Sequence, residues 1–151
     1  MWDATDVISI SGYYAIGVDD EQAAKKDPNK VLVSDTSVEA LKRRVLPIKE
    51  NLRKVSQRYD RPLFFIELGL CSAAPWIHND PNTMIYDGDE QARFYQAMLE
   101  AFWDEPWFIG FVWWDWHTDL YSLEKAKTDT TFCIYGKPAE KVVKEWYSKP
   151  R

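Results

Sequence analysis

The chain has 151 residues, of which 46% are apolar, with 8 Trp, 8 Tyr and 7 Phe, so it can fill the core of one domain or part of one. Its net charge is −5 and its basic residues are dispersed, which argues against nucleic acid or an anionic membrane as a partner. The sequence has neither a run of about 18 apolar residues nor a signal-peptide pattern after Met1. Neither a membrane span nor a leader is expected, and the location, cytoplasmic or secreted, stays open.

Three apolar segments predict strands, at residues 6–11 (DVISIS), 63–68 (LFFIEL) and 108–114 (FIGFVWW). The last two are nearly continuous, which is typical of strands covered on both faces. A helical pattern follows each segment. Apolar spacing predicts helices over residues 38–55, with a capping box at TSVE (36–39), over residues 87–103, and from Pro138 onward. Pro47 should kink or break the first helix, and the order is βαβαβα.

This order implies an α/β fold with parallel strands and right-handed crossovers. A doubly wound sheet and part of a (β/α)8 TIM barrel both satisfy it. The long connections, residues 12–35, 69–87 and 115–135, all follow strands, so the functional face lies at the carboxyl ends of the strands. Three strands are fewer than the eight or so of a closed barrel. The outer strands should therefore pair with a complementary barrel half or drive self-association.

Two carboxylates lie at predicted strand ends. Glu67 closes the second strand, where an ionised group is costly unless it is paired or hydrogen-bonded. A salt bridge to an arginine or a hydrogen bond to a loop is the structural alternative to catalysis. Asp115 follows the third strand. If the strands are neighbours, both acids open into one cleft, and a retaining glycosidase needs two carboxyl groups about 5–5.5 Å apart.

Aromatic rings gather at or just after the predicted strand ends. Such rings either stack on the apolar faces of sugars or pack in the core. Because they fall in three separate loops on one face, we favour a carbohydrate groove. The rings belong to Tyr13, Tyr14, Trp76, Trp113, Trp114 and Trp116.

No cofactor and no metal site is expected. Cys71 and Cys133 lie far apart without a CxxC or Cys/His spacing, and whether they pair is open. Residues 78–80 (HND) and His117 with Asp119 lack the spacing of a known site and are interpreted as loop residues. No GxGxxG or GxxxxGK[ST] motif follows a strand, so a phosphate-binding loop is not expected either.

Several segments together resemble the carboxyl-terminal part of the β-mannanase-type glycoside hydrolases of family 113. They are FIELG followed by APW, the stretch DEQARFYQAMLEAFWDEPWFIGFVWWDW, and GKPAEKVVKEWY. WDATDVISISGYY also resembles the segment of that family before its sixth barrel strand. The resemblance covers nearly all of residues 1–151 and implies strand–helix units six to eight of a (β/α)8 barrel.

The resemblance implies that Glu67 is the nucleophile of retaining hydrolysis, and that the acid/base glutamate belongs to the fourth unit, upstream of these residues. Trp114 matches the floor of a sugar subsite, bordered by Tyr13 or Tyr14, and Asp115 becomes a neighbouring cleft residue. Relatives tend to carry an Asp where this chain has Ser11-Gly12, which leaves the polarity of the subsite open. The isolated chain is expected to be inactive. A non-catalytic carbohydrate-binding or scaffold module is the alternative.

Overall fold

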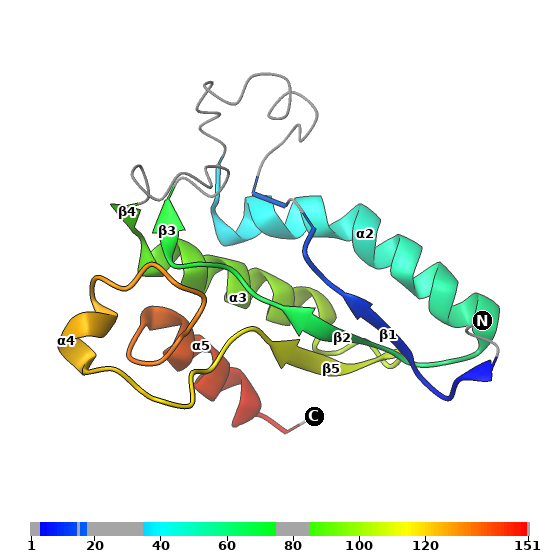
Figure 1. Ribbon diagram of the computed structural model, residues 1–151. Helices are drawn as coiled ribbons and strands as arrows, with labels where there is room; N and C mark the ends of the chain where they lie inside the picture. The colour runs from blue at the N-terminus through cyan, green and yellow to red at the C-terminus, as the bar shows by residue number, and fades with distance from the viewer. Residues whose placement is uncertain (1–3, 15, 18–34, 75–84, 151) are drawn as a thin grey trace, which may run out of the picture.

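Three parallel strands form the central sheet. The computed structural model describes residues 4–14, 16–17, 35–74 and 85–150. In this part of the chain β1 (Ile8–Ser11), β2 (Leu63–Leu68) and β5 (Phe108–Trp113) pair in the order β1-β2-β5. Their arrows point the same way in Figure 1, and the short helix α4 (Leu123–Ala126) lies beyond the arrowheads. The predicted strands and their parallel order are confirmed.

The first long helix, α2, spans Val38–Tyr59 without a break. Its N-cap is Ser37, whose Oγ accepts from the Ala40 amide, so the capping box predicted one residue earlier is wrong. The helix continues through Pro47, so the proline does not break it. Buried residues on both sides of Pro47, Leu41 and Leu52 among them, anchor the helix to the core, and this packing offsets the backbone hydrogen bond that proline cannot make.

The other two long helices begin where the sequence predicts. In α3 (Gly88–Phe102), the carboxylate of Asp87 accepts from the Glu90 amide at 2.7 Å and caps the first turn. In α5 (Pro138–Tyr147), Pro138 occupies the first turn. The segments expected to be loops contain two further pieces of structure, α4 and the antiparallel pair β3 (Ala73–Ala74) and β4 (Ile85–Tyr86).

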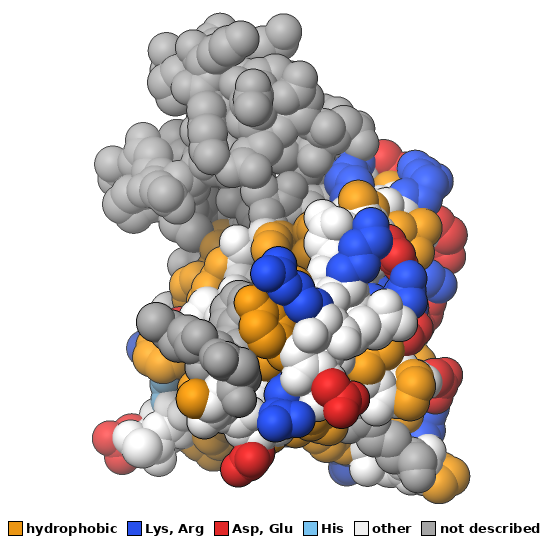
Figure 2. All heavy atoms as spheres, turned by 90° about the vertical axis from the view of Figure 1, so that its right-hand side faces the viewer, with side chains coloured by type: hydrophobic (Ala, Val, Ile, Leu, Met, Phe, Trp, Pro, Cys, Tyr) orange, Lys and Arg blue, Asp and Glu red, His pale blue; other side chains and the backbone are white. Residues whose placement is uncertain are grey.

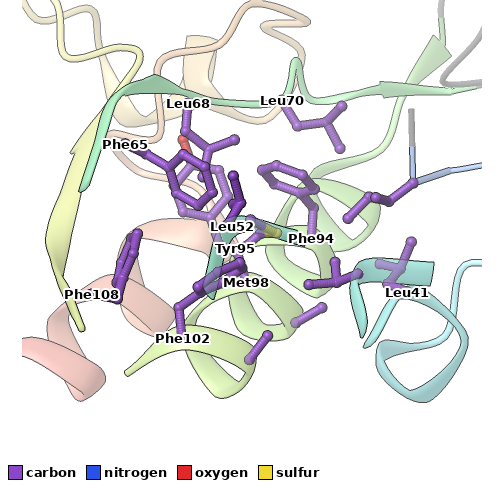
Figure 3. Packing of buried hydrophobic residues seen from close by; sticks show 14 of the residues in the cluster. Leu41, Leu52, Phe65, Leu68, Leu70, Phe94, Tyr95, Met98, Phe102 and Phe108 are labelled. Carbon is purple, nitrogen blue, oxygen red and sulfur yellow. The ribbon is translucent and has the colours of Figure 1, made fainter. Parts of the chain in front are cut away.

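The hydrophobic core lies between one face of the sheet and the helices. Figure 3 shows Phe65 of β2 surrounded by rings and aliphatic side chains from α3 and β5. Its ring centroid lies 5.2 Å from those of both Phe102 and Phe108, within the range of favourable aromatic contacts. Leu68 and Tyr95, both fully buried, continue this core toward the carboxyl ends of the strands.

The opposite face of the sheet is open. Ile66, Ile109 and Val112 point away from the core and are 49%, 48% and 51% exposed. The expectation that the strands are covered on both faces is therefore wrong for this chain alone. A doubly wound sheet carries helices on both faces. Helices on one face only are the arrangement of a barrel wall.

The molecular surface carries both signs of charge. On the face shown in Figure 2, lysine and arginine side chains alternate with acidic ones. Lys42 pairs with Glu100 of α3, and Lys49 pairs with Glu105, so two ion pairs join α2 to α3 and to the turn that follows it. None of the helices in the described residues has the length and apolarity needed to cross a membrane.

Candidate active site

Glu67 lies near the carboxyl end of β2, partly exposed, and its partner is a tyrosine. The Tyr13 hydroxyl donates a hydrogen bond to Glu67 Oε1 at 2.9 Å. In the described residues no arginine pairs with Glu67, so the salt-bridge alternative is not what the structure contains. Burial raises the pKa of Tyr13, and the hydrogen bond to Glu67 with the charges of Glu67 and Asp115 raises it further. Tyr13 therefore stays protonated and remains a donor to the carboxylate.

The backbone after β5 passes directly over the end of β2. The Trp114 amide donates to the Leu68 carbonyl oxygen at 2.7 Å, and a Cβ on Gly69 would lie 1.9 Å from the Trp114 carbonyl oxygen. Only glycine permits this approach. The contact brings Trp114, whose side chain is 50% exposed, to the same edge of the sheet as Glu67. The peptide bond between Trp114 and Asp115 is cis.

Asp115 lies beside this carboxylate–tyrosine pair rather than in it. Its charge, like that of Glu67, contributes to the raised pKa of Tyr13. Its Oδ2 lies 3.2 Å from His117 Nε2. Asp115 thus has a partner of its own, in keeping with a neighbouring cleft residue.

The remaining aromatic candidates differ in position. Tyr14 is half-buried and packs edge-on against Phe65, with centroids 6.3 Å apart, so it belongs to the border of the core. Trp113 stacks on Tyr95 at 4.4 Å and is likewise a packing residue. Trp116 is 52% exposed. Trp76 and residues 78–80 lie outside the described residues.

Two buried residues of α3 support the site, and the sequence interpretation assigned them no role in it. The Tyr95 hydroxyl donates to the Trp114 carbonyl oxygen at 3.4 Å. The Gln91 side-chain amide donates to the carbonyl oxygens of Leu70 and Phe132, at 2.7 and 3.1 Å, and so joins the segments that follow β2 and β5. The sequence signal for this role was a polar residue, Gln91, on the apolar stripe of the helix, because a buried polar side chain needs hydrogen-bond partners.

A buried lysine joins the same two segments. Lys137 is 1% exposed, and its ammonium donates to Asp129 Oδ2 and to Ser72 Oγ, both at 2.7 Å, and to the Thr131 carbonyl oxygen at 3.1 Å. All three of its protons are used, which is the condition for burying such a charge. The loops at the carboxyl ends of β2 and β5 are therefore held as one unit.

The two cysteines are both free thiols. Cys133 is fully buried and lies close to Asp115 and His117, and one potential ligand atom from each of the three is within 4.8 Å of the others. The spacing rules missed this group because Cys133 is separated from Asp115 and His117 by a loop containing α4.

The sheet presents a carboxylate, a tyrosine and exposed indoles at its carboxyl edge. Parallel (β/α) units with such groups at this edge are typical of the barrel glycoside hydrolases, and comparisons with known proteins agree with that class. The model of Glycoside Hydrolase Family 113 matches residues 1–137. The chain belongs to this family, and the resemblance stated from the sequence is confirmed.

Solved structures of the same family match over nearly the whole chain. The GH113 β-mannanase AaManA from Alicyclobacillus acidocaldarius, in complex with ManMIm, is 36% identical with a TM-score of 0.68, over 97% of this chain and 40% of that one. A GH113 β-1,4-mannanase in a complex structure is 31% identical with a TM-score of 0.71, over 99% of this chain and 41% of its own. The chain thus spans about 40% of the length of the enzymes it matches, and the sheet is part of a (β/α)8 barrel.

More distant structures share the fold alone. A β-glucuronidase from Bifidobacterium dentium matches 98% of this chain and 22% of its own, at 18% identity and a TM-score of 0.53. No protein with a curated description matches the sequence.

Proposed function

We propose that residues 1–151 are the carboxyl-terminal part of a retaining β-mannanase barrel, units six to eight, in which Glu67 is the nucleophile. The observation that carries this proposal is the partly exposed Glu67 carboxylate at the end of β2, held by Tyr13 in a chain of family 113. The substrate class follows from the matched relatives, which are described as β-mannanases at 30–36% identity.

In the proposed reaction the two Glu67 oxygens have separate tasks. Oε1 accepts the hydrogen bond from Tyr13, and Oε2 attacks the anomeric carbon of the sugar. The bond between the anomeric carbon and the leaving oxygen breaks as an ester to Glu67 forms, and an acid on another barrel strand gives the leaving oxygen its proton. The same group then takes a proton from water, which attacks the ester and releases the sugar with its configuration retained.

The proposed sugar subsite uses the exposed indole of Trp114 as its floor, with Tyr13 at its border. An indole presents an apolar face for the C–H groups of a pyranose ring, and its neighbours supply polar contacts. Trp116, Trp76 and Asp115 are proposed to contact substrate further along the groove. Tyr14 borders the core, so it would support the subsite from beneath.

The acid/base and most of the substrate cleft are proposed to come from a complementary barrel segment. Two features support this: the chain spans about 40% of its relatives, and Ile66, Ile109 and Val112 lie exposed on the face that a closed barrel fills with side chains. Without that segment the chain lacks general acid catalysis, worth about 10²- to 10⁴-fold, and substrate positioning. The isolated chain should therefore be inactive, and its open sheet face and edges should favour self-association.

The test combines this chain with the amino-terminal barrel half of a family 113 β-mannanase and measures release of reducing sugar from β-1,4-mannan. Glu67→Gln should lower kcat by at least about 10³-fold, because the covalent route is closed. The matched control is Glu124→Gln, on the exposed surface of α4, which should leave kcat unchanged. The chain alone should release no sugar above background.

A second substrate separates the role of Glu67 from that of the acid. A β-mannosyl fluoride with fluorine also at C2 needs no proton on its leaving group, and its glycosyl-enzyme turns over slowly. Mass spectrometry of the combined protein should show one sugar added at Glu67. If the label attaches elsewhere, or if Glu67→Gln keeps mannan hydrolysis, the nucleophile assignment is wrong. If the combined protein binds mannooligosaccharide but neither hydrolyses mannan nor takes up the label, a non-catalytic carbohydrate-binding module becomes the better description.

A further inference from the structure

Three side chains of different elements meet beside the carboxyl end of β5. Asp115 and His117 follow the strand within four residues, and Cys133 lies in the segment before α5. One ligand atom from each lies within 4.8 Å of the other two. A carboxylate, an imidazole and a thiol are the three side-chain types that bind Zn²⁺ most often.

We propose that Asp115, His117 and Cys133 form a binding site for a divalent cation of the zinc type. Tetrahedral Zn²⁺, with bonds of about 2.0–2.3 Å, holds its ligand atoms roughly 3.3–3.6 Å apart. His117 Nε2 and Asp115 Oδ2 are already 3.2 Å apart, as two ligands of one ion would be. Because the three ligand atoms lie within 4.8 Å of one another, a shift of about 1 Å brings Cys133 Sγ to coordination distance.

One atom of the group is short of a partner. Asp115 Oδ1 is buried and makes no hydrogen bond to the described residues, a costly state that a cation on this carboxylate relieves. The Cys133 thiol is fully buried, forms no disulfide and has the Tyr121 hydroxyl as a side-chain hydrogen-bond partner. Binding would release its proton to solvent, and the thiolate selects zinc-type cations over Mg²⁺ or Ca²⁺.

A tyrosine supports two of the proposed ligands from outside. The Tyr121 ring packs edge-on against the His117 ring, with centroids 5.9 Å apart. Its hydroxyl lies 3.4 Å from the Cys133 carbonyl oxygen. Such outer contacts orient metal ligands and limit the conformations that they must lose on binding.

Three protein ligands leave the fourth coordination position for water. Because Asp115 and His117 lie at the start of the segment between β5 and α5 and Cys133 lies near its end, the ion would join the two ends of that segment. That segment carries Trp116, and a metal cross-link there should raise the thermal stability of the chain, because the unfolded chain lacks the site. The proposal does not depend on Glu67 being a nucleophile, and its readout needs no glycosidase activity.

The experiment adds Co²⁺, which replaces zinc and reports thiolate ligation by an intense near-ultraviolet charge-transfer band, to the reduced, metal-free chain. We expect one Co²⁺ per chain with this band, displacement of Co²⁺ by Zn²⁺, and a higher Tm with Zn²⁺. Cys133→Ser should abolish the band. His117→Ala and Asp115→Asn should each weaken binding by more than about 10-fold, since even an outer-sphere partner contributes about 10- to 100-fold.

The second cysteine supplies the matched control. Cys71 is also a free thiol but is no part of the group, so Cys71→Ser should keep the band and the affinity. His117 is partly exposed, so His117→Ala tests the site even if the buried Cys133→Ser variant fails to fold. A wild-type chain without a thiolate band, a band that survives Cys133→Ser, or unchanged affinity in His117→Ala would each overturn the proposal.

Discussion

Replacing Lys137 by methionine tests whether the loops at the carboxyl ends of β2 and β5 are held together by buried charge. Methionine keeps much of the side-chain length but removes the ammonium that contacts Asp129, Ser72 and Thr131. Asp129, whose side chain is 9% exposed, would then keep its charge with hydrogen bonds from Thr131 and Tyr121 but no cation.

The expected cost follows from this loss of one partner. Removing one member of a buried ion pair typically costs about 3–5 kcal/mol, because the remaining charge stays desolvated. Asp129 retains the hydroxyl donors of Thr131 and Tyr121, the Thr131 amide and slight exposure, so we expect the lower end of that range, about 3 kcal/mol. With an m-value of about 2 kcal/mol/M, the urea midpoint falls by about 1.5 M.

Urea unfolding followed by tryptophan fluorescence and by circular dichroism measures this directly. The matched control is Lys127→Met: Lys127 pairs with Glu124 at 2.9 Å on the surface, with the two side chains 67% and 84% exposed, and an exposed pair contributes about 0–1 kcal/mol. The double variant with Asp129→Asn should recover part of the loss, since no charge is left buried. If Lys137→Met and Lys127→Met lose similar stability, the buried network does not join the loops.

Three further outcomes follow from the site. Tyr13→Phe should lower kcat/KM of the complemented protein by about 10-fold, the equivalent of one hydrogen bond to a charged group, whereas Tyr14→Phe should not. Equal effects of the two substitutions would contradict the role of Tyr13 as the donor to Glu67. Gly69→Ala places a Cβ against the Trp114 carbonyl oxygen and should weaken mannooligosaccharide binding, measured by calorimetry, by at least about 10-fold. Burial of Asp129 opposes its charge, but Lys137 and Thr131 more than offset this and hold its pKa below its ordinary value of 3.8. The contribution of Asp129 to folding stability is therefore complete above pH 3.8 and falls as the pH drops through the folded pKa. The acid titration of Asp129→Asn should lack this contribution.

The architecture could be predicted from the sequence because it depends on local pattern. Continuous apolar runs located the strands, and apolar residues at three- and four-residue steps located the helices. Asp87 and Pro138 marked helix starts by their capping chemistry. Glu67 stood out because a carboxylate at the end of an apolar strand needs a cause.

The contacts that complete the site were beyond sequence reasoning because they join residues far apart in the chain. The hydrogen bond from Tyr13 to Glu67 spans 54 positions, and the bond from Lys137 to Ser72 spans 65. Neither has a local signature. Pro47 shows the opposite case, where a strong local rule was overridden by packing along the whole of α2.

The open face of the sheet explains why two strand segments are apolar throughout, and it is the face that the proposed complementary barrel segment would cover. A strand with one face in solvent alternates apolar and polar residues. Ile66, Ile109 and Val112 interrupt that alternation, so the segments at 63–68 and 108–114 are nearly continuous apolar runs. In a closed (β/α)8 barrel these inward positions are filled by branched side chains in layers. We infer that these side chains suit an enclosed barrel interior, because in this chain alone about half of their apolar surface stays in contact with water. In the proposed enzyme, the barrel segment that covers them is also the one that brings the acid to face Glu67.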